Sequence, residues 1–240
     1  HETVLQRLKK TLGDQSQKTL QARCNYSVCL MDLGKIEESR LLLEELAKDC
    51  VQVLGEDHPL NARVISDLAI AYGHLGHLEH SEHLEREALA IRERILGPEH
   101  PDTLTLMANL GTTLELLERS EEALLLHNKA LDGRQNVLGP DHPDTINSMV
   151  NMAITLGYLE RYEEAEGYER RALDILERTL GSEHPETLVT KSNLAVTLGL
   201  RGDLEGEAAL GKEVLETRRR IFGSQDPDTL MSLYNLASTL

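Results

Sequence analysis

Leu138-Gly139-Pro140-Asp141-His142-Pro143-Asp144-Thr145 is the stretch that decides the fold, because copies of it recur along the whole chain. The copies read LGPEHPDT at 96–103, LGSEHPET at 180–187 and FGSQDPDT at 222–229, with LGEDHPLN at 54–61 and a degenerate LGDQSQKT at 12–19. Their glycines, each 42 residues after the last, are Gly13, Gly55, Gly97, Gly139, Gly181 and Gly223. A fixed period of roughly 20–50 residues is typical of repeat solenoids. The sequence therefore predicts an all-α array of 42-residue helix-turn-helix repeats that forms one domain over residues 1–240.

Each copy of this joint combines the end of one helix with the start of the next. Glycine tolerates the left-handed conformation common just past a helix end, so we expect Gly139 to occupy C′ in an αL conformation. Pro143 suits the first position of the following helix, where a missing N–H costs nothing. His142 then falls at the N-cap, and Asp226 takes this place in the last copy. The recurring His-Pro pair is therefore interpreted as a helix-initiating joint rather than a catalytic motif.

Between joints, the sequence predicts a helix A of about four turns, a short turn and a longer helix B that runs to the next Leu-Gly. Helix A carries an Asn or Asp at a constant position followed by an apolar and a small residue. This polar row is read either as hydrogen bonds between adjacent helices or as a ligand-binding ladder, and comprises Asn25, Asp67, Asn109, Asn151, Asn193 and Asn235. The turn contains Gly34, Gly76 or Gly202, or a charged substitute at Glu118 and Glu160. Glu207 replaces a small residue of helix B, so looser packing is expected there.

Composition excludes several classes of protein. The net charge of −16 and the pI near 5.0 argue against nucleic-acid binding, which needs a basic surface. No apolar run approaches the ~20 residues of a membrane span. The odd number of cysteines, Cys24, Cys29 and Cys50, suits reduced thiols, and we predict a cytoplasmic protein. The sequence shows neither a start methionine nor a signal segment, and we expect it to be part of a longer chain.

Motifs for enzymatic chemistry are missing from the sequence. It contains no phosphate-binding glycine loop, and its carboxylates are spread over the surfaces expected for B helices. We therefore predict a non-enzymatic protein without a cofactor.

Histidines recur every third residue from His74 to His83, and an i, i+3 pair on a helix can hold a transition metal. His80 and His83 are a weak metal-binding candidate, because neither an HExxH motif nor a cysteine accompanies them.

The helix pattern resembles the tetratricopeptide repeat, and the 42-residue unit with its LGxxHPDT joint is similar to the kinesin light chain subclass. The resemblance extends from Gly13 to Leu240. Similar arrays follow a nucleotide-binding switch domain in fungal and bacterial signalling proteins, where they act as sensors. The resemblance implies a right-handed superhelix in which the A helices line a concave groove. In kinesin light chains this groove binds short cargo peptides.

Transferred by position, the groove would be lined by Val28, Arg63, Ser66, Ile70, Thr105, Ala108, Thr112, Glu115, Asn147, Val150, Ile154, Val189, Ser192, Val196 and Tyr234. Arg63 is the one basic residue in this row, which departs from the cargo-binding pattern. We therefore expect a protein or peptide partner with apolar anchors and neutral or basic flanks, bound by a scaffold or adaptor. The alternatives are a regulatory array of a nucleotide-binding signalling protein and an architectural spacer. The terminal helices lack their repeat partners, which predicts end-to-end self-association or continuation of the chain.

Overall fold

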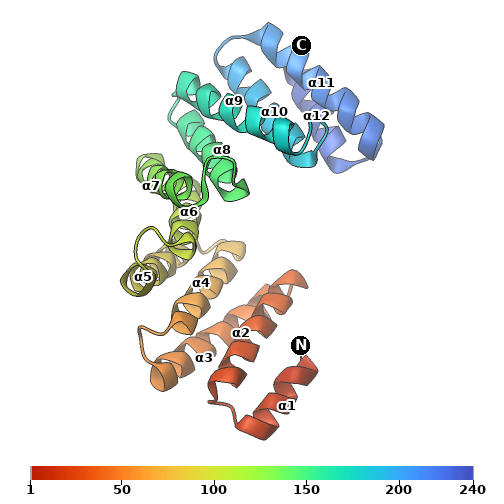
Figure 1. The fold of residues 1–240 in the computed structure, drawn as a ribbon. Helices are drawn as coiled ribbons and strands as arrows, with labels where there is room; N and C mark the ends of the chain where they lie inside the picture. The colour runs from red at the N-terminus through yellow and green to blue at the C-terminus, as the bar shows by residue number, and fades with distance from the viewer. Residues whose placement is uncertain (1, 240) are drawn as a thin grey trace. The chain divides into compact units, whose positions relative to one another are not determined.

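A computed structural model describes residues 2–239, which form twelve α-helices and no β-strand (Figure 1). Contacts divide the chain into two compact units, which are described separately. Their boundary in the sequence lies between Gly133 and Arg134. Unit 1 contains α1 (Glu2–Leu12), α2 (Gln17–Asp32), α3 (Ile36–Leu54), α4 (Pro59–His74), α5 (Leu78–Leu96), α6 (Pro101–Leu116) and most of α7 (Ser120–Leu138). Unit 2 contains the end of α7, then α8 (Pro143–Tyr158), α9 (Tyr162–Thr179), α10 (Pro185–Leu200), α11 (Leu204–Phe222) and α12 (Pro227–Thr239). The prediction of an all-α repeat array is confirmed.

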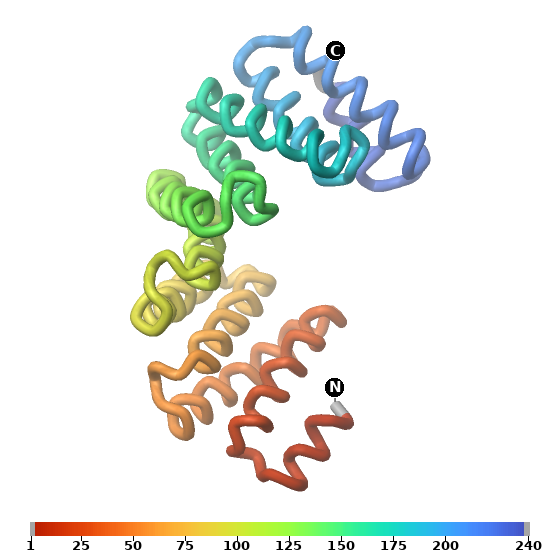
Figure 2. Tube along the Cα trace, viewed as in Figure 1, coloured from red at the N-terminus to blue at the C-terminus, as the bar shows by residue number. Residues whose placement is uncertain are grey.

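Within each unit, consecutive helices run antiparallel and pack against one another (Figure 2). The complete A helices α2, α4, α6, α8 and α10 each have 16 residues, and the B helices have 18 or 19. Leucines at the helix interfaces are fully buried, among them Leu43, Leu110 and Leu114 in unit 1 and Leu156 and Leu194 in unit 2. Burying each such side chain stabilises the array by roughly 1.5–3 kcal/mol, so the regular apolar stripe accounts for the regular fold. None of the helices in the described part of the chain is long and apolar enough to cross a membrane.

The histidine of each joint caps the following helix as predicted. His142 has an extended backbone, and its Nδ1 accepts a hydrogen bond from the Asp144 backbone N–H at 3.2 Å. Asp226 does the same in the last copy, since its Oδ1 accepts from the backbone N–H groups of Asp228 and Thr229. The joint is closed by its threonine, because the Thr145 hydroxyl donates to the Gly139 carbonyl at 2.8 Å. One histidine and one threonine therefore satisfy backbone groups that the chain reversal would otherwise leave unpaired.

The joint glycines differ from the prediction in conformation. Gly55, Gly97 and Gly223 are C-cap residues with φ near +90° and ψ of 164°, 162° and 165°. This region is distinct from the expected αL conformation and is essentially accessible to glycine alone. The structure thus places these three glycines one position earlier than predicted, at the C-cap itself, because the chain must extend at once toward the next N-cap. Gly181 instead follows the C-cap Leu180 and lies at C′ as predicted. The αL conformation is found instead in the turn between helices A and B, where Glu118 and Glu160 have φ of 59° and 60°.

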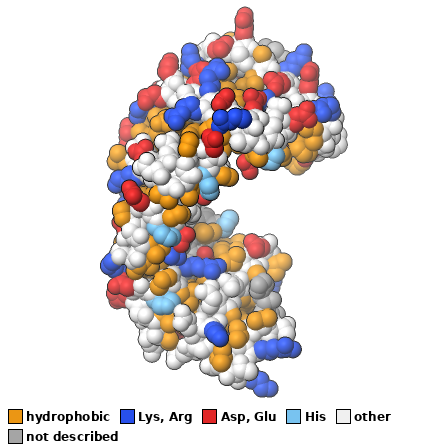
Figure 3. All heavy atoms as spheres, viewed as in Figure 1, with side chains coloured by type: hydrophobic (Ala, Val, Ile, Leu, Met, Phe, Trp, Pro, Cys, Tyr) orange, Lys and Arg blue, Asp and Glu red, His pale blue; other side chains and the backbone are white. Residues whose placement is uncertain are grey.

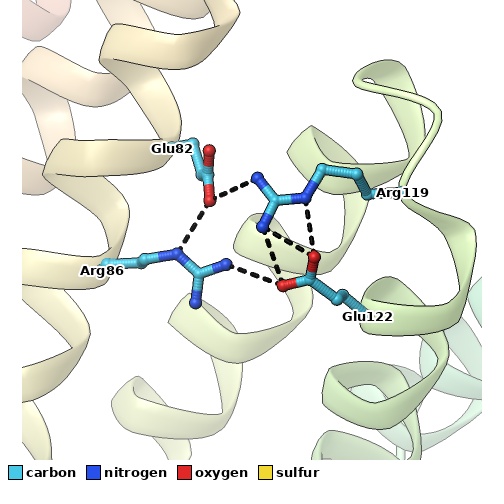
Figure 4. A network of polar contacts seen from close by, with 4 residues as sticks. All are labelled: Glu82, Arg86, Arg119 and Glu122. Atoms are coloured by element: carbon cyan, nitrogen blue, oxygen red, sulfur yellow. Dashed lines mark hydrogen bonds and ion pairs between the residues drawn. The ribbon is translucent and has the colours of Figure 1, made fainter.

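Charged side chains connect neighbouring helices on the surface of unit 1 (Figure 4). Glu82 and Arg86 on α5 face Arg119, in the turn before α7, and Glu122 on α7. Arg119 lies 2.8 Å from Glu82 and 2.7 Å from Glu122, and Arg86 lies 2.8 Å from Glu82 and 3.2 Å from Glu122. Hydrogen bonding to Arg119 lowers the pKa of the Glu122 carboxyl. Each charge therefore has two neighbours of opposite sign. The second attraction offsets part of the side-chain conformational entropy that is lost when an exposed ion pair is held in one geometry.

Glycines on the A helices make room for large B-helix side chains at two places. Gly111 lies under the buried imidazole of His127 in unit 1. Gly199 lies under the Glu207 carboxylate in unit 2, where an added Cβ would be 2.4 Å from Oε2. The sequence predicts looser packing at Glu207, and the structure shows that the missing side chain of Gly199 accommodates it.

Candidate partner-binding clefts

Two clefts with matching linings lie at equivalent places in the two units. The first, cleft 1, lies between α4 and α6 with α5 behind them and has a volume of about 430 Å³. The second, cleft 2, lies between α8 and α10 with α9 behind them and has a volume of about 260 Å³. The shared positions, given as cleft 1 then cleft 2, are Ile70/Ile154, Gly73/Gly157, His74/Tyr158, Glu85/Glu169, Asn109/Asn193, Thr112/Val196, Thr113/Thr197 and Leu116/Leu200. Each pair is separated by two repeats, so the same pocket is built twice.

The clefts open where an A helix carries a glycine in its interior. A Cβ at Gly157 would meet nothing within 4 Å, and one at Gly73 would meet only the Ser81 hydroxyl at 3.5 Å. The repeat between them has Glu115 at this position, and the first repeat has Met31. The repeat that contains α10 has Gly199 there, and the Glu207 carboxylate occupies the space beside it. Glycine inside a helix costs roughly 0.5–1 kcal/mol relative to alanine, so local helix stability does not account for the two glycines. The space that they leave forms part of the clefts.

A buried glutamate from the B helix lines each cleft. Glu85 is 5% exposed and Glu169 is 3% exposed. The Thr197 hydroxyl donates to Glu169 Oε1 at 3.1 Å, and Thr113 hydrogen-bonds to Glu85 in the same way. Oε2 of each carboxyl has no hydrogen-bond partner among the described residues. Burial raises the pKa of both carboxyls to about 7, with the threonine hydrogen bond opposing this shift and Glu82 adding to it at Glu85.

Apolar side chains form the mouths of the clefts. Ile70 is 37% exposed beside Leu116 in cleft 1, and Ile154 is 39% exposed beside Leu200 in cleft 2. Val196 is 44% exposed in cleft 2, where Thr112 stands at the equivalent position of cleft 1. Acidic and basic side chains are interspersed with apolar ones over the visible faces of both units (Figure 3). Among the described residues, no lysine or arginine lines either cleft.

Most of the predicted groove residues lie at the surface of A helices. The exposed ones are Ile70, Thr105, Thr112, Asn147, Ile154, Val189, Val196 and Tyr234, and the half-buried ones are Val28, Arg63, Ser66, Val150 and Ser192. Of these, Ile70 and Thr112 come together in cleft 1, and Ile154 and Val196 in cleft 2. A separate cleft of about 270 Å³ in unit 1 brings together Arg63, Ser66 and Thr105. The sequence did not predict the glutamates of the clefts.

Two predicted groove residues are placed differently. Ala108 is 6% exposed and belongs to the hydrophobic core of unit 1, because this position of α6 faces its neighbouring helices. The Glu115 side chain is 9% exposed, and its Oε1 lies 3.4 Å from Nε2 of the buried His127. Ala108 therefore belongs to the core, and the Glu115 side chain lies against His127 of its own B helix.

The polar row of the A helices has mixed roles. Asp67 accepts a hydrogen bond from the Cys24 thiol at 3.2 Å, which connects α4 to α2. Asn25 instead accepts from Gln21 within α2. Asn109 and Asn193 line the clefts at equivalent positions. The interpretation as hydrogen bonds between helices thus holds for Asp67, and the ligand-binding interpretation stays a prediction for Asn109 and Asn193.

The histidines considered for a metal site pack around an aromatic ring. His80 stacks on Tyr72 with ring centroids 5.3 Å apart, and His77 meets the same ring edge-on. His83 lines a shallow cleft with both His80 and Tyr72. In the described part of the chain, no group of three or more His, Cys, Asp or Glu side chains is arranged to hold a metal ion.

Comparisons with known proteins agree with the helix pattern. Family profiles described as tetratricopeptide repeat match residues 19–60, 62–102, 86–136, 126–178 and 158–220. A search of curated protein sequences gave no match. Among solved structures, nearly identical TPR-like repeats of a kinesin light chain-type protein from Podosopora anserina match with a TM-score of 0.77 and 23% identity, over 84% of this chain and 95% of that one.

Two further structures have a similar fold. BtubC (BKLC) from P. vanneervenii matches with a TM-score of 0.77 and 18% identity, over 93% of this chain and 89% of that one. The STAND signal transduction ATPase with a tetratricopeptide repeat sensor from Pyrococcus horikoshii matches with a TM-score of 0.78 and 12% identity, over 99% of this chain and 35% of that one. At these identities the structural matches establish the fold, while the profile matches cover most of the sequence. The chain belongs to the tetratricopeptide repeat family.

Proposed function

We propose that this chain is a protein-interaction module whose A-helix surface binds segments of partner proteins at clefts 1 and 2. Tetratricopeptide repeats generally bind proteins or peptides. The observation that carries the proposal is the recurrence of one cleft, with exposed isoleucine and leucine at its mouth, in both units. Exposed apolar side chains around a concave surface are typical of binding sites.

Charge reversal at the mouth of each cleft tests this proposal. Peptides are first selected from a phage-displayed random library against the wild-type chain, and their affinities are then measured by fluorescence anisotropy. We expect Ile70→Glu or Ile154→Glu to weaken binding by at least ~10-fold, which corresponds to about 1.4 kcal/mol. Leu125→Glu is the matched control, because Leu125 is 65% exposed on the B helix α7.

Equal loss of affinity in the control and the test variants would contradict the proposal. Thermal unfolding of all three variants separates binding from folding. If Ile154→Glu unfolds the array, the isoleucine is part of the core and does not form a binding surface. We expect instead that its melting temperature stays close to that of the wild type, because the side chain is already well exposed.

A second function, the sensor array of a nucleotide-binding signalling protein, is favoured by the match to the Pyrococcus horikoshii STAND sensor. This chain spans about a third of that protein. The two functions differ in the domain that would accompany the array in a longer protein. A nucleotide-binding domain encoded upstream would support the sensor function, whereas a coiled coil would support an adaptor. End-to-end self-association and a cytoplasmic location stay predictions.

A further inference from the structure

We propose that clefts 1 and 2 each bind one basic side chain, arginine or lysine, of a partner segment, with Glu85 or Glu169 as its counter-ion. This inference rests on the proposed interaction function and names the chemistry of the partner. It follows from three properties of the clefts: an unpaired carboxyl oxygen, an apolar mouth and the absence of an internal cation.

The unpaired oxygen shows what each site lacks. Thr113 or Thr197 satisfies one oxygen of each carboxyl, and Oε2 of both glutamates has no partner among the described residues. An unsatisfied buried polar atom costs about 1–3 kcal/mol, and more when the group is charged. A hydrogen-bond donor that enters the cleft removes this cost, and a cationic donor does so most strongly because such bonds are roughly twice as strong as neutral ones.

The walls fit the rest of a basic side chain. Arginine and lysine have apolar stems that pack along hydrophobic surfaces while their charged ends reach a polar group. The mouths supply that surface, through Ile70 and Leu116 in cleft 1 and through Ile154 and Leu200 in cleft 2. The occupant would thus contact isoleucine and leucine along its stem and the glutamate at its end.

The electrostatic surroundings favour a cation over other donors. Neither cleft has a lysine or arginine in its described lining. Glu82 lies close enough to add negative potential at Glu85. The chain carries a net charge of −16, which attracts basic segments over roughly a Debye length, ~8 Å at physiological salt. A pKa of about 7 leaves a substantial ionised fraction near neutral pH, and a bound cation would favour that fraction.

Each isoleucine at a cleft mouth provides a separate probe in solution. With methyl-labelled isoleucine, NMR signals of Ile70 and Ile154 report occupancy of cleft 1 and cleft 2 independently. The ligand is a synthetic peptide with one central arginine between leucines and otherwise neutral residues. Its control is the same peptide with citrulline, which keeps the shape of arginine but lacks the charge. We expect both methyl signals to shift and saturate with the arginine peptide, and the citrulline peptide to bind at least ~30-fold more weakly.

The isosteric variants Glu85→Gln and Glu169→Gln assign the effect to each carboxyl. Glu85→Gln should remove the response at Ile70 and keep the response at Ile154, and Glu169→Gln should do the reverse. The unaltered cleft controls for folding and for net charge in the same molecule. Gly157→Met is a second variant, since Met31 stands at this position in the first repeat and a side chain there would fill open space in cleft 2. It should abolish the Ile154 response without changing any charge.

Three results would overturn the inference. Equal shifts with the citrulline peptide would show that the clefts bind peptides without using the carboxylate, and the proposed function would survive alone. A loss of both responses in Glu85→Gln would show long-range attraction by net charge in place of a local ion pair. No saturable shift at either isoleucine with the arginine peptide would show that the clefts do not accept a basic side chain, whereas binding of library-selected peptides would still support the proposed function.

Discussion

The imidazole of His127 lies directly over Gly111, so that a Cβ at position 111 would be 2.6 Å from Cε1 of the ring. The histidine is fully buried. The other A helices have serine or alanine at the position of Gly111, whereas this repeat has glycine beneath the His127 ring. The two residues therefore form one packing unit across α6 and α7.

This contact predicts that the effect of Gly111→Ala on stability changes sign when His127 is removed. Gly111→Ala should destabilise the chain by about 1–3 kcal/mol through overpacking, despite alanine's higher helix propensity. In a His127→Ala background the same substitution should stabilise by up to ~1 kcal/mol, because the ring is gone. Chemical denaturation of the wild type, the two single variants and the double variant gives the coupling free energy between positions 111 and 127. Gly167→Ala on α9 is the control and should stabilise, since its Cβ would meet nothing within 4 Å. Independent effects at positions 111 and 127 would contradict the packing assignment.

The turns at Glu118 and Glu160 predict two stabilising substitutions. Both residues have positive φ, which costs a non-glycine residue about 1–2 kcal/mol. Gly34, Gly76 and Gly202 occupy the same turn elsewhere. Glu118→Gly and Glu160→Gly should each raise the free energy of unfolding by about 0.5–1 kcal/mol. This is the strain relieved at positive φ minus the stabilisation of the unfolded chain by the greater conformational entropy of glycine. Glu121→Gly, inside α7, should lower it by a similar amount. A fall in stability for all three would show that these turns tolerate glutamate without strain.

The joint predicts a strong contrast between its glycine and its histidine. Gly139 has φ of 89°, and a Cβ there would meet open space, so the cost of a side chain comes from the backbone alone. Gly139→Val should cost about 1–3 kcal/mol. His142→Asp should change stability by less than about 0.5 kcal/mol, because Asp226 already caps α12 in the same way. Thermal unfolding measures both. Similar losses in the two variants would mean that the histidine does more than cap its helix.

The buried glutamates predict an unusual dependence of stability on pH. Their pKa values are raised from 4.5 to about 7, so the folded chain binds more protons than the unfolded chain between these values. Stability should therefore fall as the pH rises from about 4.5 to 7 and then level off, by an amount on the order of 3 kcal/mol per glutamate. Glu85→Gln and Glu169→Gln should each flatten this dependence and raise stability most above pH 7. Urea denaturation across this range tests it, and an unchanged slope in the double variant would disprove the assignment.

The sequence predicted the helices well because six copies of one joint mark their ends. Capping by His142 and Asp226 also followed from local chemistry, which depends on neighbours in the chain. The sequence was less informative where a side chain meets another helix. Ala108 and Glu115 share a helix with Thr112, yet a modest rotation about that helix separates core positions from surface positions.

The glutamates of the clefts could not be predicted for a related reason. Glu85 stands on the buried stripe of its B helix, where Leu43 stands one repeat earlier, but this position alone does not show that its carboxylate lines a cleft. Its surroundings are formed by Thr113 in the next repeat and by the open space beside Gly73 in the helix before. Such a site becomes visible only when three helices are placed together.

The recurrence of the cleft at every second repeat has a consequence for how such an array can evolve. Its heritable module is a pair of repeats, one whose interior glycine leaves open space and one in which this space is filled, by Glu115 itself or, at Gly199, by the Glu207 carboxylate. Duplication of a pair adds one complete cleft, whereas duplication of the filled repeat alone lengthens the chain without adding one. The valence of the array toward partners would thus rise in steps of two repeats, and two arrays of different length can present the same number of clefts.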